Sequence, residues 1–343
     1  MNTQKRIAFI GAGRIADLHY NALKLENHRA EVIAVSDIRN DAVQSRAGEW
    51  NVKGYISYKE MIEKEKPDAV YILLPHNLHL EAVDFAMKRG ISVFLEKPIA
   101  ADLEQALQIE QVAKNSKATL FIAHNGLFHP AFDEVNALVK TGKIGKPVFV
   151  RGISAGWLLF KDWDFRLFKG QTGGGCWMDA GSHLVYCMME LIGKIKSVNA
   201  LMANMVRNEM EGEDHCIVNI QFENGCLGQA FASYGHKLPG YELDWPNGYT
   251  NAIEVFGDKG AVKYQISPKP VIELYSEASK TEKEQGWKEI EIKEPFSSSF
   301  NYETKHFLDC LETGQRPRVT ASDAVEILKI LKSAYAENII FPK

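Results

Sequence analysis

The fold of this chain is decided by the stretch Ile7-Ala8-Phe9-Ile10-Gly11-Ala12-Gly13-Arg14-Ile15-Ala16. Four apolar residues lead directly into Gly-x-Gly-x-x-Ala, and apolar residues then follow at helical spacing as far as Glu26. A short apolar run before a glycine turn and an amphipathic helix indicates a buried parallel strand followed by its crossover helix. The stretch therefore predicts the first βα unit of a doubly wound sheet.

The same alternation continues to about residue 123. A helical pattern over 79–89 ends at Gly90, the usual residue just past a helix end. Further strands are predicted at 31–35, 67–74, 91–95 and 118–123. Strands that alternate with helices at this spacing predict right-handed crossovers and a parallel sheet.

After about Asn125 the pattern changes to strands joined by short turns, which indicates antiparallel neighbours. Strands are expected at 147–154, 197–206, 215–222, 227–234, 252–256, 261–266 and 271–275, and helices at 177–192, 300–313 and 321–338. The charge-dense segment 280–294 is interpreted as a solvated edge or hairpin. We therefore expect an α/β protein, with a Rossmann domain over 1–123 and an α+β domain over 124–343 whose closing helix packs back on the first domain.

Composition excludes several classes of function. The 343 residues carry 40 Lys+Arg and 44 Asp+Glu, a formal net charge of -4, which argues against a nucleic-acid partner. No apolar run approaches the roughly 18–20 residues of a membrane span, and the apolar run after Arg6 is too short for a signal peptide. The five cysteines lie far apart without a CxxC, so we expect a cytoplasmic protein without structural disulfides or a bound metal.

The glycine turn predicts a dinucleotide site. Glycines permit a tight turn and let backbone N–H groups approach a pyrophosphate at the helix N-terminus. Asp37 ends the next predicted strand, where an acid binds the adenosine ribose, although it could instead cap a helix. An acid here would repel a 2′-phosphate and favours NAD over NADP. Arg39 is the reservation, because an arginine could pair with that phosphate.

Two more motifs follow predicted strands at the edge where ligands of open α/β sheets bind. Pro75-His76-Asn77-Leu78-His79 could bind cofactor, or its histidines could be exposed loop residues or a helix cap. Glu96-Lys97-Pro98 could present Lys97 to a substrate hydroxyl and offset a developing alkoxide, or form a surface Glu–Lys pair. If the sheet is doubly wound, these motifs lie close together at one edge of it, which favours a functional site over unrelated surface residues.

Asp179 and His183 open the helix of the second domain, within Gly173-Gly174-Gly175-Cys176-Trp177-Met178-Asp179-Ala180-Gly181-Ser182-His183. At i and i+4 they should share one helical face, where a carboxylate can hold the tautomer of a histidine that accepts a carbinol proton. The pair could also bind a metal or be a structural helix pair, but no third ligand suggests itself.

Together these motifs resemble the Gfo/Idh/MocA oxidoreductase family over essentially the whole chain. The resemblance implies a nicotinamide cofactor, sugar or cyclitol substrates, and an open-faced second sheet that mediates homodimers or homotetramers. It also implies a catalytic group of Lys97, Asp179 and His183. Cofactor contacts are expected from Gly11, Ala12, Gly13, Arg14, Ile15, Asp37, Leu74, Pro75, His76, Asn77, His79, Glu96, Lys97 and Asn125.

Substrate contacts are expected from Lys97, Trp163, Arg166, Asp179, His183 and Tyr241. Tyr186 stands where the family often has an aspartate, which puts familiar substrate assignments in doubt. We expect an NAD-dependent dehydrogenase that oxidises a secondary carbinol of a sugar, glycoside or cyclitol. Two alternatives stay open: a glycoside hydrolase or lyase that oxidises its substrate transiently with tightly held NAD, and a non-catalytic NAD- or sugar-sensing regulator.

Overall fold

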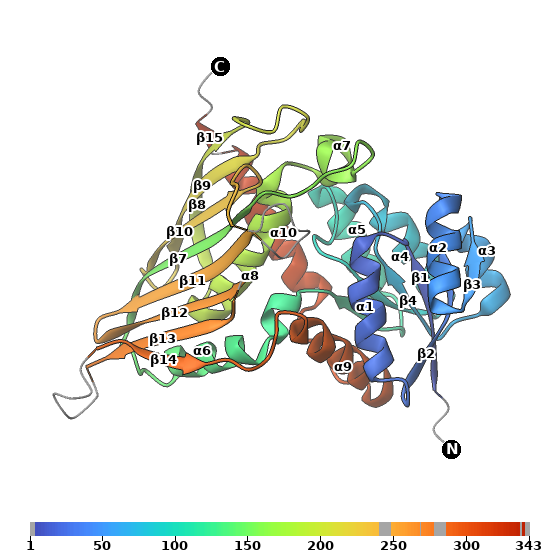
Figure 1. The fold of residues 1–343 in the computed structure, drawn as a ribbon, viewed down its shortest axis with the longest axis horizontal. Helices are drawn as coiled ribbons and strands as arrows, with labels where there is room; N and C mark the ends of the chain where they lie inside the picture. Colours follow the sequence, from blue (N-terminus) through green and yellow to red (C-terminus); the bar gives the residue numbers. More distant parts are fainter. Residues whose placement is uncertain (1–3, 240–247, 268, 278–285, 337, 340–343) are drawn as a thin grey trace. The chain divides into compact units, whose positions relative to one another are not determined.

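The chain folds into two compact units, Met1–Asn125 with Phe300–Leu328, and Gly126–Ser299 with Lys329–Lys343. The structure is a computed structural model that describes residues 4–239, 248–267, 269–277, 286–336 and 338–339. Each unit contains one sheet, and Figure 1 traces both along the chain. Tyr241, one of the expected substrate contacts, lies outside the described residues.

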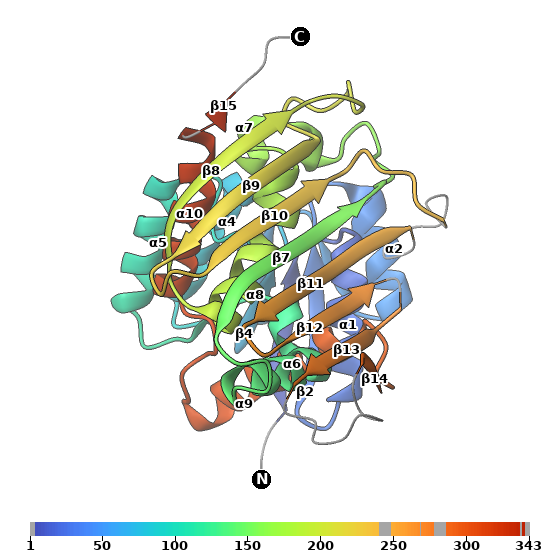
Figure 2. The same cartoon turned by 90° about the vertical axis from the view of Figure 1, so that its left-hand side faces the viewer.

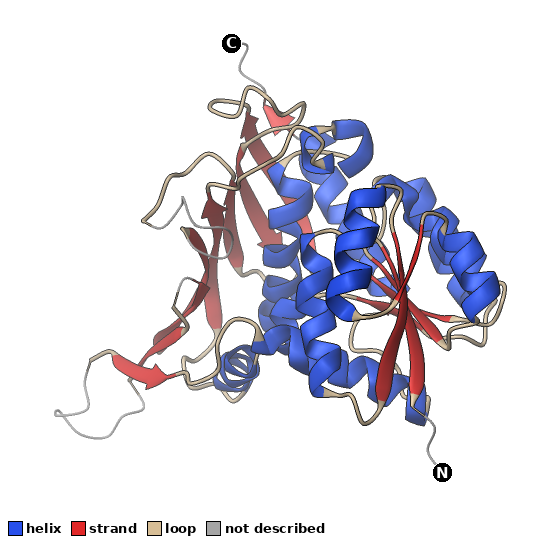
Figure 3. Cartoon of the chain, turned by 45° about the vertical axis from the view of Figure 1, so that its right-hand side comes forward, coloured by secondary structure: helices blue, strands red, loops and turns tan. Residues whose placement is uncertain are grey.

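The first unit is built on a six-stranded parallel sheet in the order β3-β2-β1-β4-β5-β6. Its strands are β1 (Lys5–Ile10), β2 (Ala30–Ser36), β3 (Lys53–Tyr55), β4 (Ala69–Ile72), β5 (Ser92–Leu95) and β6 (Leu120–Ile122). The central strands are apolar on both faces because helices cover both sides of this sheet (Figure 3). The strand order reverses beside β1, so the glycine turn after β1 lies at the point where such sheets bind ligands.

Helices of the first unit are α1 (Arg14–Leu25), α2 (Asn40–Trp50), α3 (Tyr58–Glu65), η1 (His76–Leu78), α4 (His79–Met87) and α5 (Leu103–Lys114). Helix α9 (Ser298–Thr313) joins them from the far end of the sequence, since Phe307 packs edge-on against Tyr71 of β4 at 5.6 Å. Arg29 fixes the same helix through an ion pair of 2.7 Å with Asp309. Helix α10 (Ala321–Ala336) follows, and its residues are divided between the units after Leu328.

The second unit holds a nine-stranded sheet in the order β14-β13-β12-β11-β7-β10-β9-β8-β15. Its strands are β7 (Pro147–Gly156), β8 (Ile195–Ala203), β9 (His215–Phe222), β10 (Leu227–Ser233), β11 (Tyr249–Gly257), β12 (Gly260–Ser267), β13 (Val271–Ser276), β14 (Lys288–Glu291) and β15 (Asn338–Ile339). Among the described strands of this sheet, β7–β10 and β8–β15 pair in parallel and the other pairs are antiparallel. Figure 2 shows the strands side by side, with no described helix in front of them.

Helices cover the other face of this sheet. Gly152 of β7 lets α8 (Ser182–Ile192) approach closely, because an added Cβ would lie 2.6 Å from Met188 Cε. The remaining helical segments of the unit are η2 (Asn125–Phe128), α6 (Pro130–Lys140), η3 (Phe165–Leu167), α7 (Lys169–Thr172) and η4 (Trp177–Gly181). The expected fold class, a Rossmann sheet plus a mostly antiparallel second sheet, is confirmed.

Some element boundaries predicted from the sequence are wrong. The strand expected over 197–206 ends at Ala203, because the backbone N–H groups of Met205 and Val206 donate to the Asp214 carboxylate instead of to a strand. The closing helix ends at Ala336, and Asn338–Ile339 pairs with β8. The charged segment contains β14, which forms an edge of the sheet as expected.

None of the helices in the described part of the chain combines the length and the hydrophobicity that crossing a bilayer requires.

Candidate active site

The glycine turn of the first unit has no room for side chains at its start. Gly11 has φ +108°, and an added Cβ would lie 2.4 Å from the carbonyl oxygen of Leu73. Gly13, the N-cap of α1, has nothing within 4 Å of the position of a Cβ. Gly11 therefore serves the tight turn, whereas Gly13 leaves space in front of the first amides of α1. A dinucleotide pyrophosphate fits this combination of a tight turn, open space and helix N-terminus.

Asp37 is tied to the glycine turn. Its Oδ2 accepts a 3.0 Å hydrogen bond from the Ala12 N–H, and its Oδ1 accepts a 2.9 Å bond from the Arg39 N–H. The Arg39 Nε lies 3.5 Å from the same carboxylate. The alternative in which Asp37 caps a helix is wrong, because Arg39 is the N-cap of α2. The carboxylate thus lies beside the turn, and the charge of Arg39 is already opposed by it.

The histidines after β4 are buried, so the alternative of exposed loop residues is wrong. His76 is 2% and His79 is 0% exposed. The His79 Nε2 lies 2.9 Å from the Leu74 carbonyl, and Nδ1 lies 3.2 Å from the Ile99 carbonyl. Burial lowers the pKa of His79, which favours the neutral ring. A neutral ring has a single N–H, so it donates to one of these two carbonyls, and the buried ring is not accessible for the expected direct cofactor contact.

Asn77, between these histidines, has a buried side-chain oxygen with no hydrogen-bond partner among the described residues. An unpartnered buried amide oxygen is costly unless a ligand or water satisfies it. Neighbouring Leu74 and Pro75 are half-buried and complete this turn. The NH₂ group of a nicotinamide carboxamide can donate a hydrogen bond to an amide oxygen of this kind.

Glu96 points inward rather than into a surface ion pair. Its Oε1 lies 2.8 Å from Nε2 of His19, a fully buried residue of α1, and its Oε2 accepts a 3.0 Å bond from the Lys97 N–H. Lys97 itself is half-buried and precedes a cis peptide bond to Pro98. Asn125, at the start of η2 after β6, is 8% exposed. The strand-end motifs thus converge within this unit on the carboxyl edge of the sheet.

In the second unit, Asp179 is the centre of a polar network. Its Oδ2 accepts a 3.0 Å bond from Arg166 Nε and a 2.6 Å bond from the Tyr234 hydroxyl. Arg166 Nη1 also donates to Asp164 at 3.0 Å. Arg166 therefore bridges two carboxylates, whose negative charges oppose its positive charge. Arg166 and Asp179, both expected to contact substrate, are thus bonded to each other.

The helix that carries Asp179 begins as a π-helical turn, Trp177–Gly181, and becomes α-helical at Ser182. The expectation of a regular α-helix from Trp177 is wrong, so the i, i+4 argument does not by itself place Asp179 and His183 on one face. Gly181 fits under the Trp177 ring, where a Cβ would lie 2.1 Å from Cε3. Both Asp179 and His183 are half-buried. π-Helical turns of this kind are frequent at functional sites.

A second carboxylate holds the start of this turn. Glu213 accepts hydrogen bonds from the backbone N–H groups of Gly175 at 3.0 Å and Trp177 at 2.9 Å. The Tyr335 hydroxyl of α10 donates to Glu213 at 2.8 Å. These bonds satisfy donors at a helix start that has no side-chain cap of its own.

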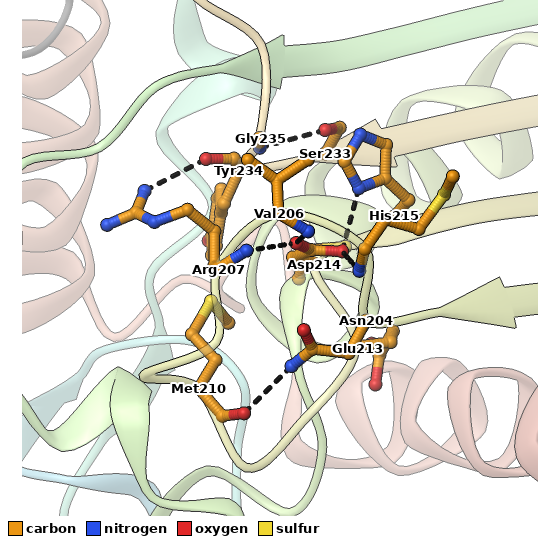
Figure 4. Close-up of polar contacts among 12 residues, drawn as sticks. Asn204, Val206, Arg207, Met210, Glu213, Asp214, His215, Ser233, Tyr234 and Gly235 are labelled. Atoms are coloured by element: carbon orange, nitrogen blue, oxygen red, sulfur yellow. Dashed lines mark hydrogen bonds and ion pairs between the residues drawn. The ribbon is translucent and has the colours of Figure 1, made fainter. Parts of the chain in front are cut away.

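Arg207 anchors the segments that carry Tyr234 and Asp214 (Figure 4). It is 3% exposed, its Nη1 donates to the carbonyls of Leu158 and Tyr234 at 2.9 Å each, and its N–H donates to Asp214 at 2.6 Å. Its guanidinium lies over the Trp157 ring at 4.3 Å. Arg207 thereby fixes Tyr234, which in turn donates to Asp179. Trp163, expected to contact substrate, is 55% exposed on the adjacent loop.

The chain matches two protein-family models that together span most of its length. Residues 5–124 match the model described as "Oxidoreductase family, NAD-binding Rossmann fold", and residues 136–337 match "Oxidoreductase family, C-terminal alpha/beta domain". The chain belongs to the Gfo/Idh/MocA oxidoreductase family. This confirms the resemblance read from the motifs.

Individual members of the Gfo/Idh/MocA family cover nearly the whole chain. Myo-inositol 2-dehydrogenase of Thermotoga maritima is 27% identical over 324 residues, 93% of this chain and 91% of that protein. A D-xylose 1-dehydrogenase (NADP(+)) of Haloferax volcanii is 25% identical over 328 residues, 92% of this chain and 91% of that protein. The structure of a levoglucosan dehydrogenase in complex with NADH shares the fold, with a TM-score of 0.87 at 16% identity and coverage of 98% of both chains.

Sequence reasoning missed several residues of this Gfo/Idh/MocA site. His19 contacts Glu96 from 77 positions away, and Tyr234 contacts Asp179 from 55 positions away. Glu213 was also missed. None of them belongs to a local motif, so only the tertiary fold reveals their partners. Among the described residues, no group of three or more His, Cys, Asp and Glu side chains is arranged to hold a metal ion.

Proposed function

We propose that this protein is an NAD-dependent oxidoreductase that transfers a hydride between nicotinamide and a secondary carbinol of a sugar, glycoside or cyclitol. The observation that carries the proposal is the Asp37 carboxylate bound to the N–H of Ala12 inside a glycine turn that cannot accept a Cβ at Gly11. In that arrangement the Asp37 carboxylate can accept a hydrogen bond from a ribose hydroxyl, and the backbone N–H groups at the start of α1 can donate to a pyrophosphate. The relatives are named as dehydrogenases of inositol, xylose and levoglucosan, and these names support the proposed substrate class.

NAD is the proposed cofactor, although two relatives are named for NADP. A 2′-phosphate on the adenosine ribose would meet the negative charge of Asp37. Arg39, the residue that could offset this repulsion, already lies 3.5 Å from that carboxylate. When bound, NAD supplies the hydride acceptor, and the expected contacts from the first unit, apart from the buried His79 ring, would hold it.

We assign three roles to the chain's own residues. His183 takes the proton of the carbinol as general base. Asp179, fixed by Arg166 and Tyr234, orients and supports the resulting imidazolium. Lys97 donates a hydrogen bond to the reacting oxygen and offsets the charge that develops there. The proton thus goes to His183 while the hydride leaves the carbinol carbon.

We also propose that copies of the chain associate through the open face of the nine-stranded sheet, as a homodimer or homotetramer. An apolar row crosses this face from Leu201 through Ile217 and Phe231 to Ile153, because these residues are direct cross-strand partners. Leu201 is 43% and Ile217 is 38% exposed, and a contiguous exposed apolar patch is typical of an interface. A second copy carries the same row and would cover it.

The function is tested with purified protein, NAD and NADP, and a panel of cyclitols, pentoses and anhydrosugars. The proposal expects reduced nicotinamide to appear with at least one polyol, and faster with NAD than with NADP. Failure of the whole panel, with NAD retained through gel filtration, would refute net oxidation and favour a transient-oxidation hydrolase or lyase.

A further inference from the structure

A buried glutamate on α9, Glu303, is bonded to the turn that follows β6 in the first unit. Its side chain is 0% exposed, and its Oε1 accepts a 2.5 Å hydrogen bond from the backbone N–H of His124. The other oxygen, Oε2, is buried and has no hydrogen-bond partner among the described residues. His124 directly precedes Asn125, one of the expected cofactor contacts. Glu303 therefore holds the turn after β6 by one oxygen only.

Glu96 is the charged group that acts on Glu303. The two carboxyl groups interact electrostatically, and Glu96 is the better stabilised anion because it accepts bonds from His19 Nε2 at 2.8 Å and from the Lys97 N–H at 3.0 Å. The Nδ1 of His19 is buried without a hydrogen-bond partner among the described residues, so Nε2 is the ring nitrogen that binds Glu96.

Two neighbouring carboxyl groups in a buried place do not both ionise readily, and the one with fewer donors keeps the proton. Burial raises the pKa of Glu303 well above its usual value, and the negative charge of Glu96 raises it further. From β4, the Tyr71 hydroxyl also interacts with Glu303 and lies beside Thr304 of α9. These hydroxyls are neutral, so they do not reverse the effect of Glu96.

We propose that Glu303 is a positioning residue that carries the proton of a Glu96–Glu303 carboxyl pair and, as a neutral acid, holds the His124–Asn125 turn beside the Glu96–Lys97 turn. This inference rests on the proposed function, because both turns carry residues expected to contact NAD. Loss of that proton as the pH rises would leave two repelling carboxylates, one bonded to each turn. Dinucleotide affinity should then fall as the pH rises.

The test compares Glu303→Gln, Glu303→Ala and a control, Asp309→Asn, by thermal unfolding and by calorimetric titration with NAD. Gln keeps an acceptor for the His124 N–H and cannot ionise. Because the pKa of Glu303 is raised in the folded protein above its usual value of 4.5, its contribution to stability is complete below pH 4.5 and is lost as the pH rises through the folded-state pKa. Asp309 is on the same helix, and its carboxylate is 37% exposed.

Three results are expected. The melting temperature of Glu303→Gln relative to the native protein should rise as the pH rises above 4.5, whereas that of Asp309→Asn should keep a constant difference, because Asp309 is not part of the buried carboxyl pair. The affinity of the native protein for NAD should fall as the pH rises, and that of Glu303→Gln should not. Glu303→Ala should bind NAD roughly tenfold more weakly at every pH.

A difference in melting temperature that does not change with pH, or a loss of NAD affinity in Glu303→Gln as large as in Glu303→Ala, would overturn the proposal. These outcomes are separate from the proposed function. A native protein that binds NAD but oxidises no polyol would refute the proposed dehydrogenase activity. The melting temperatures and NAD affinities of the Glu303 variants would still test the role of Glu303. A native protein that reduces NAD while the Glu303 variants match it in affinity and pH dependence would refute only the role of Glu303.

Discussion

The Tyr234 hydroxyl donates a 2.6 Å hydrogen bond to Oδ2 of Asp179. Arg166 donates to the same oxygen, so the carboxylate is held by a neutral and a charged donor from two different segments. Charge-assisted bonds of this kind are short and directional, and they favour the ionised carboxylate. The orientation of Asp179 is thus set by residues that no local motif contains.

Removing the Tyr234 hydroxyl tests whether this orientation matters. Tyr234→Phe keeps the buried ring but loses a hydrogen bond to a charged acceptor, worth about 1.5–3 kcal/mol. We expect kcat for polyol oxidation to fall roughly 10–100-fold while the KM for NAD stays unchanged. Ser154→Ala, which removes a buried hydroxyl paired with Tyr249 at 3.2 Å, is the control, and its kcat for polyol oxidation should fall much less. An unchanged kcat in Tyr234→Phe would show that Asp179 needs no such support.

The cofactor preference depends on Asp37. Asp37→Ser removes the carboxylate and frees Arg39 from the charge that now opposes it. We expect the ratio of kcat/KM for NAD over NADP to fall by roughly tenfold or more, measured with one polyol and both cofactors. Arg39→Ala should leave the use of NAD intact. If Asp37→Ser keeps the native ratio, the acid does not select the cofactor.

Of the two glycines in the turn, Gly11 should matter for the stability of the fold and Gly13 for NAD binding. Gly11→Ala would force a side chain into φ +108° with its Cβ 2.4 Å from a carbonyl oxygen, and we expect a loss of about 3 kcal/mol or more in the free energy of unfolding. Gly13→Ala meets no atom within 4 Å and should cost under about 1 kcal/mol, yet weaken NAD binding. Denaturant unfolding and NAD titration measure both effects. Equal destabilisation by the two variants would contradict this assignment.

The sheet face gives a prediction for assembly. Ile217→Asp places a charge in the middle of the apolar row, and we expect light scattering to show monomers or a strong shift toward them. Leu25→Asp changes a residue that is 63% exposed at the end of α1 and should leave the assembly size unchanged. A native protein that is already monomeric would refute the interface.

The sequence predicted those parts of the site that lie in contiguous motifs. The glycine turn and Asp37 follow from local rules, since a strand end, a turn and a helix start are set by neighbouring residues. The His19–Glu96 and Tyr234–Asp179 bonds depend on distant segments, and the π-helical turn depends on Gly181 packing under the Trp177 ring. The placement of α9 in the first unit depends likewise on long-range packing against Tyr71.

The proposed dehydrogenase activity is tested most directly by the absorbance of reduced nicotinamide formed from NAD and a polyol, in the native protein and in three single variants, Lys97→Ala, Asp179→Asn and His183→Ala. We expect the native protein to reduce NAD with at least one cyclitol or sugar. His183→Ala and Lys97→Ala should be slower by roughly 100-fold or more while still binding NAD. Variants that bind NAD and reduce it at the native rate would contradict the proposed catalytic group, and a native protein that reduces no cofactor with any polyol would contradict the dehydrogenase itself.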